Sequence, residues 1–331
     1  MPFAHPPLSL SAVITQLRTA GCVYAEDEAE LLLAAPFTPS ELAAALERRV
    51  AGFPLEHILG WAEFCGLRIA VEPGVFVPRR RTEFLVREAA ALLRTRHTVP
   101  GAPGFPGDAV LPWDPGLLED AVLPGVVAGV AGSSGGSNAR PAGLPDGRSA
   151  ARIADGPPTG RTAAGAVVVD LCCGSGAVGR ALAAFATGIE LHASDVDPAA
   201  VRCAHRNIDP AGGRVYEGDL YSPLPARLGG KVDILAVNAP YVPTGSISSM
   251  PHEARVHEPN VSLDGGRDGL EIQRKVAAEA RTWLKPGGHL LIETSRRQAK
   301  GTAAAVARGG LTPRIITSEE FDATVVVGLR Q

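Results

Sequence analysis

The sequence carries no excess of positive charge. Its 32 lysines and arginines stand against 35 aspartates and glutamates, which gives a formal net charge of −3. A nearly balanced chain has no global field to attract nucleic acid, although a local basic patch would escape this count. The charge therefore disfavours direct nucleic-acid binding without excluding it.

Paired cysteines and long apolar runs are also missing from the sequence. The cysteines are odd in number and none forms a CxxC pair with metal-ligand spacing: Cys22, Cys65, Cys172, Cys173 and Cys203. Such cysteines are typical of reduced cytosolic thiols, and no metal site is expected. No apolar run approaches membrane-spanning length, and residues 1–10 lack a basic segment followed by an apolar one. We therefore expect a cytoplasmic protein with no membrane partner.

The pattern of apolar residues predicts four regions. Residues 1–59 have helical spacing and are expected to form a small domain that docks the substrate. Residues 60–97 predict a β-hairpin and a connecting helix. Residues 98–160 are rich in Gly, Pro and Ser and predict a flexible insertion, although Trp113 and nearby apolar pairs could form a small satellite. Residues 161–331 are expected to form the catalytic domain.

Apolar strands alternate with helical segments throughout the last region. The expected strands lie at 167–171, 190–194, 214–217, 232–237, 289–293, 314–317 and 324–329. This alternation predicts an α/β fold with a mostly parallel sheet and helices on both faces.

The first of these strands runs into a glycine-containing loop that opens a helix. Glycines allow a ligand close to the backbone, and a helix start offers free N–H groups. Alone this element is weak evidence, because it fits dinucleotide binding or plain packing equally well. The cofactor site predicted around it comprises Asp170, Cys172, Gly174, Gly176, Asp195, Asp219, Leu220 and Asn238.

Three acids give this site its expected chemistry. Asp195 ends the second strand and could accept both ribose hydroxyls of a nucleoside, whereas Asp197, followed by proline, is better explained as a helix cap. Asp219 could accept from an adenine amino group. Asp170 could pair with a cofactor ammonium group or simply cap the loop.

The tetrapeptide Asn238-Ala239-Pro240-Tyr241 follows the strand at 232–237, at the sheet edge where function is expected. An amide NH₂ group is a poor nucleophile, so a catalyst must hold both of its protons and aim its lone pair at an electrophilic methyl group. The Asn238 side-chain oxygen and the Ala239 carbonyl could accept these protons. Pro240 keeps Ala239 extended, and Tyr241 would supply a flat wall. Alternatively, the tetrapeptide is only a strand-terminating turn.

With these residues placed, the chain resembles the HemK/PrmC family of protein-(glutamine-N5) methyltransferases. The resemblance covers most of the sequence outside the insertion. Its motifs are residues 54–60, 75–79, Thr82-Glu83, the cofactor loop with Asp195, Glu258-Pro259, 263–270, 286–290 and 293–298.

The resemblance implies a Rossmann-like class I fold with seven strands, the last antiparallel, and S-adenosylmethionine (SAM) as the methyl donor. It also implies a role in translation termination, with the glutamine of a Gly-Gly-Gln tripeptide in a peptide chain release factor as the acceptor. Glu83 joins the tetrapeptide as a candidate substrate-binding residue that would brace the Tyr241 loop, or else it is a solvated acid at a helix start.

The chain departs from the family pattern at three places. Ala239 stands where the family has proline, Arg80-Arg81 stands where it has Pro-Glu, and the insertion is long. The first change preserves the chemistry, because the acceptor is a main-chain oxygen. The second predicts a different substrate surface.

Two other functions compete with this hypothesis. A nucleic-acid methyltransferase acting on adenine N6 or guanine N2 would use the same tetrapeptide geometry. The acids between 26 and 30 and the absence of a basic-aromatic strip disfavour it. A non-catalytic SAM-binding protein is the other alternative.

Overall fold

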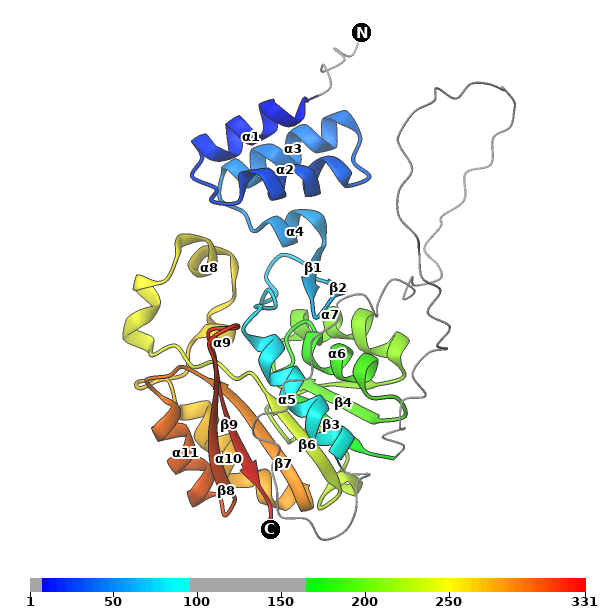
Figure 1. Ribbon diagram of the computed structural model, residues 1–331, viewed down its shortest axis with the longest axis vertical. Helices are drawn as coiled ribbons and strands as arrows, with labels where there is room; N and C mark the ends of the chain where they lie inside the picture. The colour runs from blue at the N-terminus through cyan, green and yellow to red at the C-terminus, as the bar shows by residue number, and fades with distance from the viewer. Residues whose placement is uncertain (1–7, 96–164) are drawn as a thin grey trace, which may run out of the picture. The chain divides into compact units, whose positions relative to one another are not determined.

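The computed structural model describes residues 8–95 and 165–331 (Figure 1). The flexible insertion expected at 98–160 lies outside these residues. Within the described ranges, no helix has the length and apolar character needed to cross a membrane.

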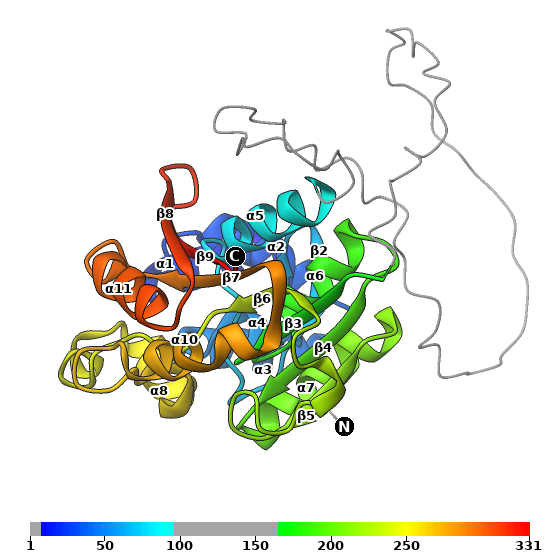
Figure 2. The same ribbon diagram turned by 90° about the horizontal axis from the view of Figure 1, so that it is seen from below.

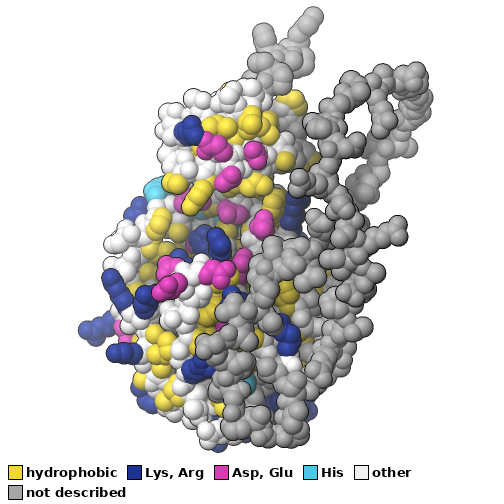
Figure 3. Space-filling view, viewed as in Figure 1, with side chains coloured by type: hydrophobic (Ala, Val, Ile, Leu, Met, Phe, Trp, Pro, Cys, Tyr) yellow, Lys and Arg dark blue, Asp and Glu magenta, His cyan; other side chains and the backbone are white. Residues whose placement is uncertain are grey.

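The N-terminal part of the chain forms short helices around a small core of their own. Their bounds are α1 (Leu10–Thr19), α2 (Ala25–Ala34), α3 (Pro39–Val50) and α4 (Leu55–Leu59). Val13, Leu17, Leu32 and Leu46 pack together in this core. Acidic side chains lie among hydrophobic ones on the face of these helices seen in Figure 3, and three acids fill the first turn of α2.

The predicted hairpin and connecting helix follow. Strands β1 (Trp61–Phe64) and β2 (Leu67–Ala70) pair antiparallel. The two residues of their turn, Cys65 and Gly66, have φ values of 53° and 71°, as a tight hairpin requires. Helix α5 (Thr82–Thr95) then leads to the catalytic domain.

The catalytic domain is built on a seven-stranded sheet with the order β5-β4-β3-β6-β7-β9-β8. The strands are β3 (Val167–Leu171), β4 (Glu190–Asp195), β5 (Arg214–Glu217), β6 (Val232–Val237), β7 (Leu284–Thr294), β8 (Thr312–Ser318) and β9 (Ala323–Leu329). Only β9 runs against the others of this sheet, since it pairs antiparallel with both β7 and β8. The predicted class I fold, with an antiparallel last strand, is confirmed.

Helices cover both faces of the sheet. Besides α5, the longer ones are α6 (Ala177–Phe185), α7 (Pro198–Ile208), α10 (Glu271–Trp283) and α11 (Ala299–Arg308). Helix α5 packs beside α6 and α6 beside α7, while α10 packs beside α11. Figure 2 shows α5 and α6 on one side of the sheet and α10 on the other. Every residue of β3 and β6 is buried, as central parallel strands covered on both faces should be.

Two features of the catalytic domain differ from the sequence-based expectation. Strand β7 begins at Leu284 rather than near 289, because Leu284 pairs with Val232 before a register shift. The loop after the tetrapeptide contains two short helices, α8 (His252–His257) and α9 (Asn260–Leu263), that apolar periodicity did not indicate. Both differences concern segments interrupted by glycine or proline, where periodicity carries little signal.

Candidate active site

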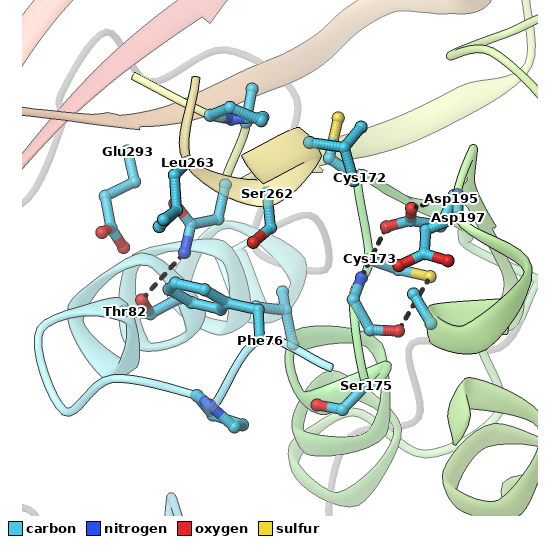
Figure 4. Close-up of a pocket in the computed structure, with 18 of the residues that line it drawn as sticks. Phe76, Thr82, Cys172, Cys173, Ser175, Asp195, Asp197, Ser262, Leu263 and Glu293 are labelled. Carbon is cyan, nitrogen blue, oxygen red and sulfur yellow. Dashed lines mark hydrogen bonds between the residues drawn. The ribbon is translucent and has the colours of Figure 1, made fainter. Parts of the chain in front are cut away.

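A cavity of about 300 Å³ lies at the carboxyl ends of β3, β4 and β6. It brings together the glycine loop, Asp195, Asp219 and the whole tetrapeptide. Figure 4 shows Cys172, Cys173 and Asp195 on one side of this cavity, with Phe76, Thr82 and Glu293 on the other. Apart from Gly176 and Glu83, the residues predicted for cofactor and substrate therefore line one cavity.

The two glycines of the loop are placed differently. Gly174 lines the cavity with φ 55°, and no heavy atom would lie within 4 Å of a Cβ added there. Gly176 precedes α6 with φ 78° and is not among the residues that line the cavity, and a Cβ added there would lie 2.8 Å from Ile208 Cδ1. The loop thus needs its first glycine beside open space and its second for close packing.

Asp195 is held by the backbone of the glycine loop. Its Oδ2 accepts from the Gly174 N–H at 2.8 Å, and its Oδ1 accepts from the Asp197 N–H at 3.0 Å. Each carboxylate oxygen keeps a further lone pair for a ligand. Burial raises the pKa of Asp195. Asp197 caps α7 through the Ala199 N–H at 2.9 Å, as predicted for it.

Asp170 lies beneath the loop and is buried. Its Oδ2 accepts from the Gly179 N–H at 2.8 Å, so it caps the first turn of α6, the helix that follows the loop, rather than the loop itself. Burial raises its pKa to about 7 despite this hydrogen bond. Asp170 also borders the cavity, together with Cys172.

On the β5 side, Asp219 is exposed, and the Leu220 carbonyl accepts from the Ser194 hydroxyl at 2.8 Å.

The tetrapeptide leaves β6 with its Asn238 side chain facing the cavity wall. Asn238 Nδ2 donates to Thr82 Oγ1 at 3.1 Å, so the network assigns Oδ1 as the oxygen left to accept from a ligand. The main-chain oxygen of Tyr241 accepts from Gln298 Nε2 at 2.9 Å. Ala239 is buried, and the Tyr241 hydroxyl lies 3.5 Å from Glu293 Oε1. The Asn238 side chain therefore borders the cavity, as its expected role requires.

Glu293 and Thr82 belong to two of the family motifs, but the sequence analysis did not assign either residue to the site. Glu293 is the penultimate residue of β7 and is 2% exposed, and its Oε2 has no hydrogen-bond partner among the described residues. Burial raises its pKa to about 7, while the neighbouring Thr82 hydroxyl and Arg81 guanidinium favour the charged form. Because Glu293, like Asp170, is the penultimate residue of an apolar strand at this sheet edge, the rule that selected Asp170 also selects it.

Glu83 does not line the cavity, and its proposed contact with the Tyr241 loop is wrong. Its Oε1 accepts instead from the Cys65 N–H at 3.0 Å and braces the hairpin turn. Burial raises its pKa. Successive helix residues point about 100° apart, so at this helix start Thr82 faces the cavity and Glu83 faces the hairpin.

The chain is similar to known methyltransferases. Residues 161–258 match the family model described as methyltransferase small domain. A release factor glutamine methyltransferase of Geobacter sulfurreducens is 29% identical over 89% of this chain and 80% of its own length. A 4-amino-L-phenylalanine/4-methylamino-L-phenylalanine methyltransferase of Streptomyces pristinaespiralis is 28% identical over 87% and 76%. A ribosomal protein uL3 glutamine methyltransferase of Burkholderia pseudomallei is 37% identical over 41% and 47%.

Proposed function

The chain belongs to the HemK/PrmC family of SAM-dependent methyltransferases, and we propose that it methylates the side-chain amide nitrogen of a glutamine in a translation protein. The observation that carries the proposal is the position of Asn238. Its side chain borders the same cavity as Asp195, and its Nδ2 is already bonded to Thr82. The free Oδ1 is then an acceptor for one proton of an NH₂ group.

The described residues fit SAM. Asp195 has lone pairs for the ribose hydroxyls, Asp219 and Leu220 border the place of the adenine, and Gly174 leaves room beside its backbone. The carboxylate of Asp170 pairs with the ammonium group of the amino acid part of SAM. When bound, SAM supplies a methyl group activated by a sulfonium.

The chain's own residues hold the acceptor nitrogen. Asn238 Oδ1 and the Ala239 carbonyl accept its two protons, and the ring of Tyr241 confines the flat amide between them. Holding the reacting atoms in line supplies on the order of 7–11 kcal/mol of the barrier. Once methylated, the nitrogen is cationic and acidic, so its surplus proton leaves to a neighbouring oxygen or to water.

We propose more specifically that the methyl acceptor is the glutamine of a Gly-Gly-Gln tripeptide in a peptide chain release factor. The release factor relative, similar over most of both chains, supports this substrate. The uL3 relative makes a ribosomal glutamine the next protein acceptor to test. We assign the N-terminal helices of residues 10–59 to docking of the protein substrate.

A free aromatic amino acid is a second candidate acceptor. The Streptomyces pristinaespiralis relative supports it, since 4-amino-L-phenylalanine presents a flat NH₂ group. Arg81 lines the cavity in place of the family's glutamate. Burial raises the pKa values of Tyr241 and Glu293, and the Arg81 guanidinium opposes this rise. A guanidinium in this position suits the carboxylate of such a substrate.

Labelling with tritiated SAM tests these assignments. Purified release factors, ribosomal protein uL3, 4-amino-L-phenylalanine and total RNA are offered separately to the wild type and to Asn238→Ala. We expect label in a protein, located by mass spectrometry on a glutamine, and none with Asn238→Ala. Label in RNA alone, or no transfer to any acceptor despite SAM binding, would refute protein glutamine methylation. Label in the free amino acid alone would establish the second candidate.

A further inference from the structure

We propose that Glu293 is a positioning residue that sets the orientation of the Asn238 side-chain amide through the hydroxyl of Thr82. The inference rests on the proposed role of Asn238 as the acceptor for the substrate NH₂ group. It adds a residue that acts on Asn238 through Thr82. Its effect is to decide which end of the Asn238 amide faces the substrate.

The side chains of Asn238, Thr82 and Glu293 lie next to one another along one wall of the cavity. Asn238 Nδ2 donates to Thr82 Oγ1 at 3.1 Å. The Glu293 carboxylate, whose Oε2 has no hydrogen-bond partner among the described residues, is directed at Thr82 (Figure 4). Thr82 and Glu293 are 3% and 2% exposed, so water does not compete for these contacts. These three side chains join the start of α5 to the ends of β6 and β7.

Counting protons fixes the direction of the hydrogen bonds. An ionised carboxylate can only accept, and a threonine hydroxyl has a single proton. When that proton is directed to Glu293, the Thr82 oxygen can only accept from Asn238. The Asn238 NH₂ group must then face Thr82, and Oδ1 must face the cavity. Asn238 alone could adopt either orientation, because its two ends have nearly the same shape.

The opposite orientation would disable the site. If the group at 293 donated a proton to Thr82, the Thr82 hydroxyl could donate to Asn238 Oδ1. The Asn238 NH₂ group would then face the substrate NH₂ group, and two donors would meet. The acceptor that holds the substrate proton would be lost while the shape of the cavity stayed the same.

The surroundings of Glu293 keep it able to accept. The Arg81 guanidinium and the Tyr241 hydroxyl are the titratable groups that face it among the described residues. From the neighbouring elements, Val325 of β9 pairs with it and Gln273 of α10 bonds its main-chain oxygen. Burial raises the Tyr241 pKa to about 12, so this hydroxyl stays protonated and can donate to Glu293.

The test compares Glu293→Gln with Thr82→Val, Thr82→Ser and a distant control, Glu320→Gln. Glutamine keeps the size of Glu293 but brings an NH₂ donor. We expect Glu293→Gln and Thr82→Val each to lower kcat at least about tenfold with an unchanged Kd for SAM, and Thr82→Ser to recover most of the activity that Thr82→Val loses. The double variant should be no slower than the slower single variant.

The pH profile separates this role from a structural one. The wild-type kcat should fall on the acid side, near the pKa of about 7 that burial gives Glu293, and this fall should vanish in Glu293→Gln. A wild-type kcat in Glu293→Gln, or additive losses in the double variant, would overturn the inference. If Asn238→Ala kept full activity, the proposed function itself would fail. If Asn238→Ala were inactive and Glu293→Gln fully active, only the role of Glu293 would fail.

Discussion

Two glycines separated by one residue perform different tasks in the cofactor loop. Both have positive φ, which costs an L side chain about 1–2 kcal/mol. In Gly176→Ala the new methyl would also lie against Ile208, which adds about 1–3 kcal/mol of overpacking. We therefore expect Gly176→Ala to lower the free energy of unfolding clearly more than Gly174→Ala, as measured by urea denaturation.

The two variants should rank in the opposite order when their affinity for SAM is measured by calorimetric titration. A methyl at Gly174 enters the cavity beside the cofactor, so Gly174→Ala should weaken SAM binding at least about tenfold. Gly212→Ala is the matched control, because Gly212 has φ 78° with open space around it and lies outside the cavity. Gly212→Ala should show only the loss of stability that comes from backbone strain, with SAM affinity unchanged. Equal SAM affinity in Gly174→Ala and Gly212→Ala would contradict this account.

Asp195 and Asp197 allow a second comparison between neighbouring residues. Both oxygens of Asp195 accept backbone N–H groups, so in Asp195→Asn the new NH₂ must face one of these donors. We expect SAM affinity to fall roughly 10- to 100-fold. Asp197→Asn keeps the single oxygen that caps α7, and asparagine caps as well as aspartate does. A comparable loss of affinity in both variants would exclude Asp195 as the ribose ligand.

At the scale of elements, the sequence predicted best where a segment is buried on both faces. The bounds of β3 and β6 agree with the prediction, because each is a mostly apolar run with glycine shortly before it and the cofactor loop or Asn238 directly after it. The same rule, applied to the carboxyl end of β7, would have found Glu293. Glu293 was not assigned to the site because residues 293–298 were considered only as a family motif, and no glycine loop beside Glu293 drew attention to it.

Contacts between distant segments could not be predicted from periodicity. The bond between Thr82 and Asn238 joins residues 156 positions apart. The choice between Thr82 and Glu83 depends on which side of a helix start faces the sheet, and this follows only from packing. Likewise Phe53 and His257, whose ring centroids lie 4.4 Å apart, bring the segment after α3 against α8. No local sequence pattern indicates such a contact.

The loop that follows α9 supports the tetrapeptide from behind. A Cβ on Gly269, which has φ 74°, would lie 2.2 Å from the main-chain oxygen of Tyr241. We expect Gly269→Ala to displace the tetrapeptide and to lower kcat/KM by up to about 100-fold, because small misplacements of a reacting group have effects of this size. Steady-state assays on the labelled acceptor measure the change.

The affinity for SAM should change little in the same variant, since Gly269 does not border the cavity. Gly245→Ala serves as the control, because an added Cβ there would meet no atom within 4 Å. A loss of SAM binding as large as the loss of kcat/KM would mean that the loop supports the whole cavity rather than the tetrapeptide.

At the scale of the whole molecule, the buried acids of the site oppose folding as the pH rises. Asp170 and Glu293 have folded pKa values of about 7, above their ordinary values of 3.8 and 4.5, chiefly because burial disfavours the charged forms. Below about pH 4, both folded and unfolded chains hold these protons and there is no effect. Between the ordinary and the folded values only the folded chain holds them, so raising the pH destabilises it.

This linkage predicts how Glu293→Gln changes the stability curve. One pKa unit corresponds to 1.36 kcal/mol, so the raised pKa of Glu293 removes roughly 3 kcal/mol between about pH 4 and pH 8. Burial lowers the pKa values of His57, His192 and His289, which opposes the trend, but these groups are shared by both proteins. The difference between the unfolding free energies of wild type and variant, from urea titrations at several pH values, therefore isolates Glu293. It should shift in favour of Glu293→Gln as the pH rises, and a difference that stays constant would show that the carboxylate is not held at a raised pKa.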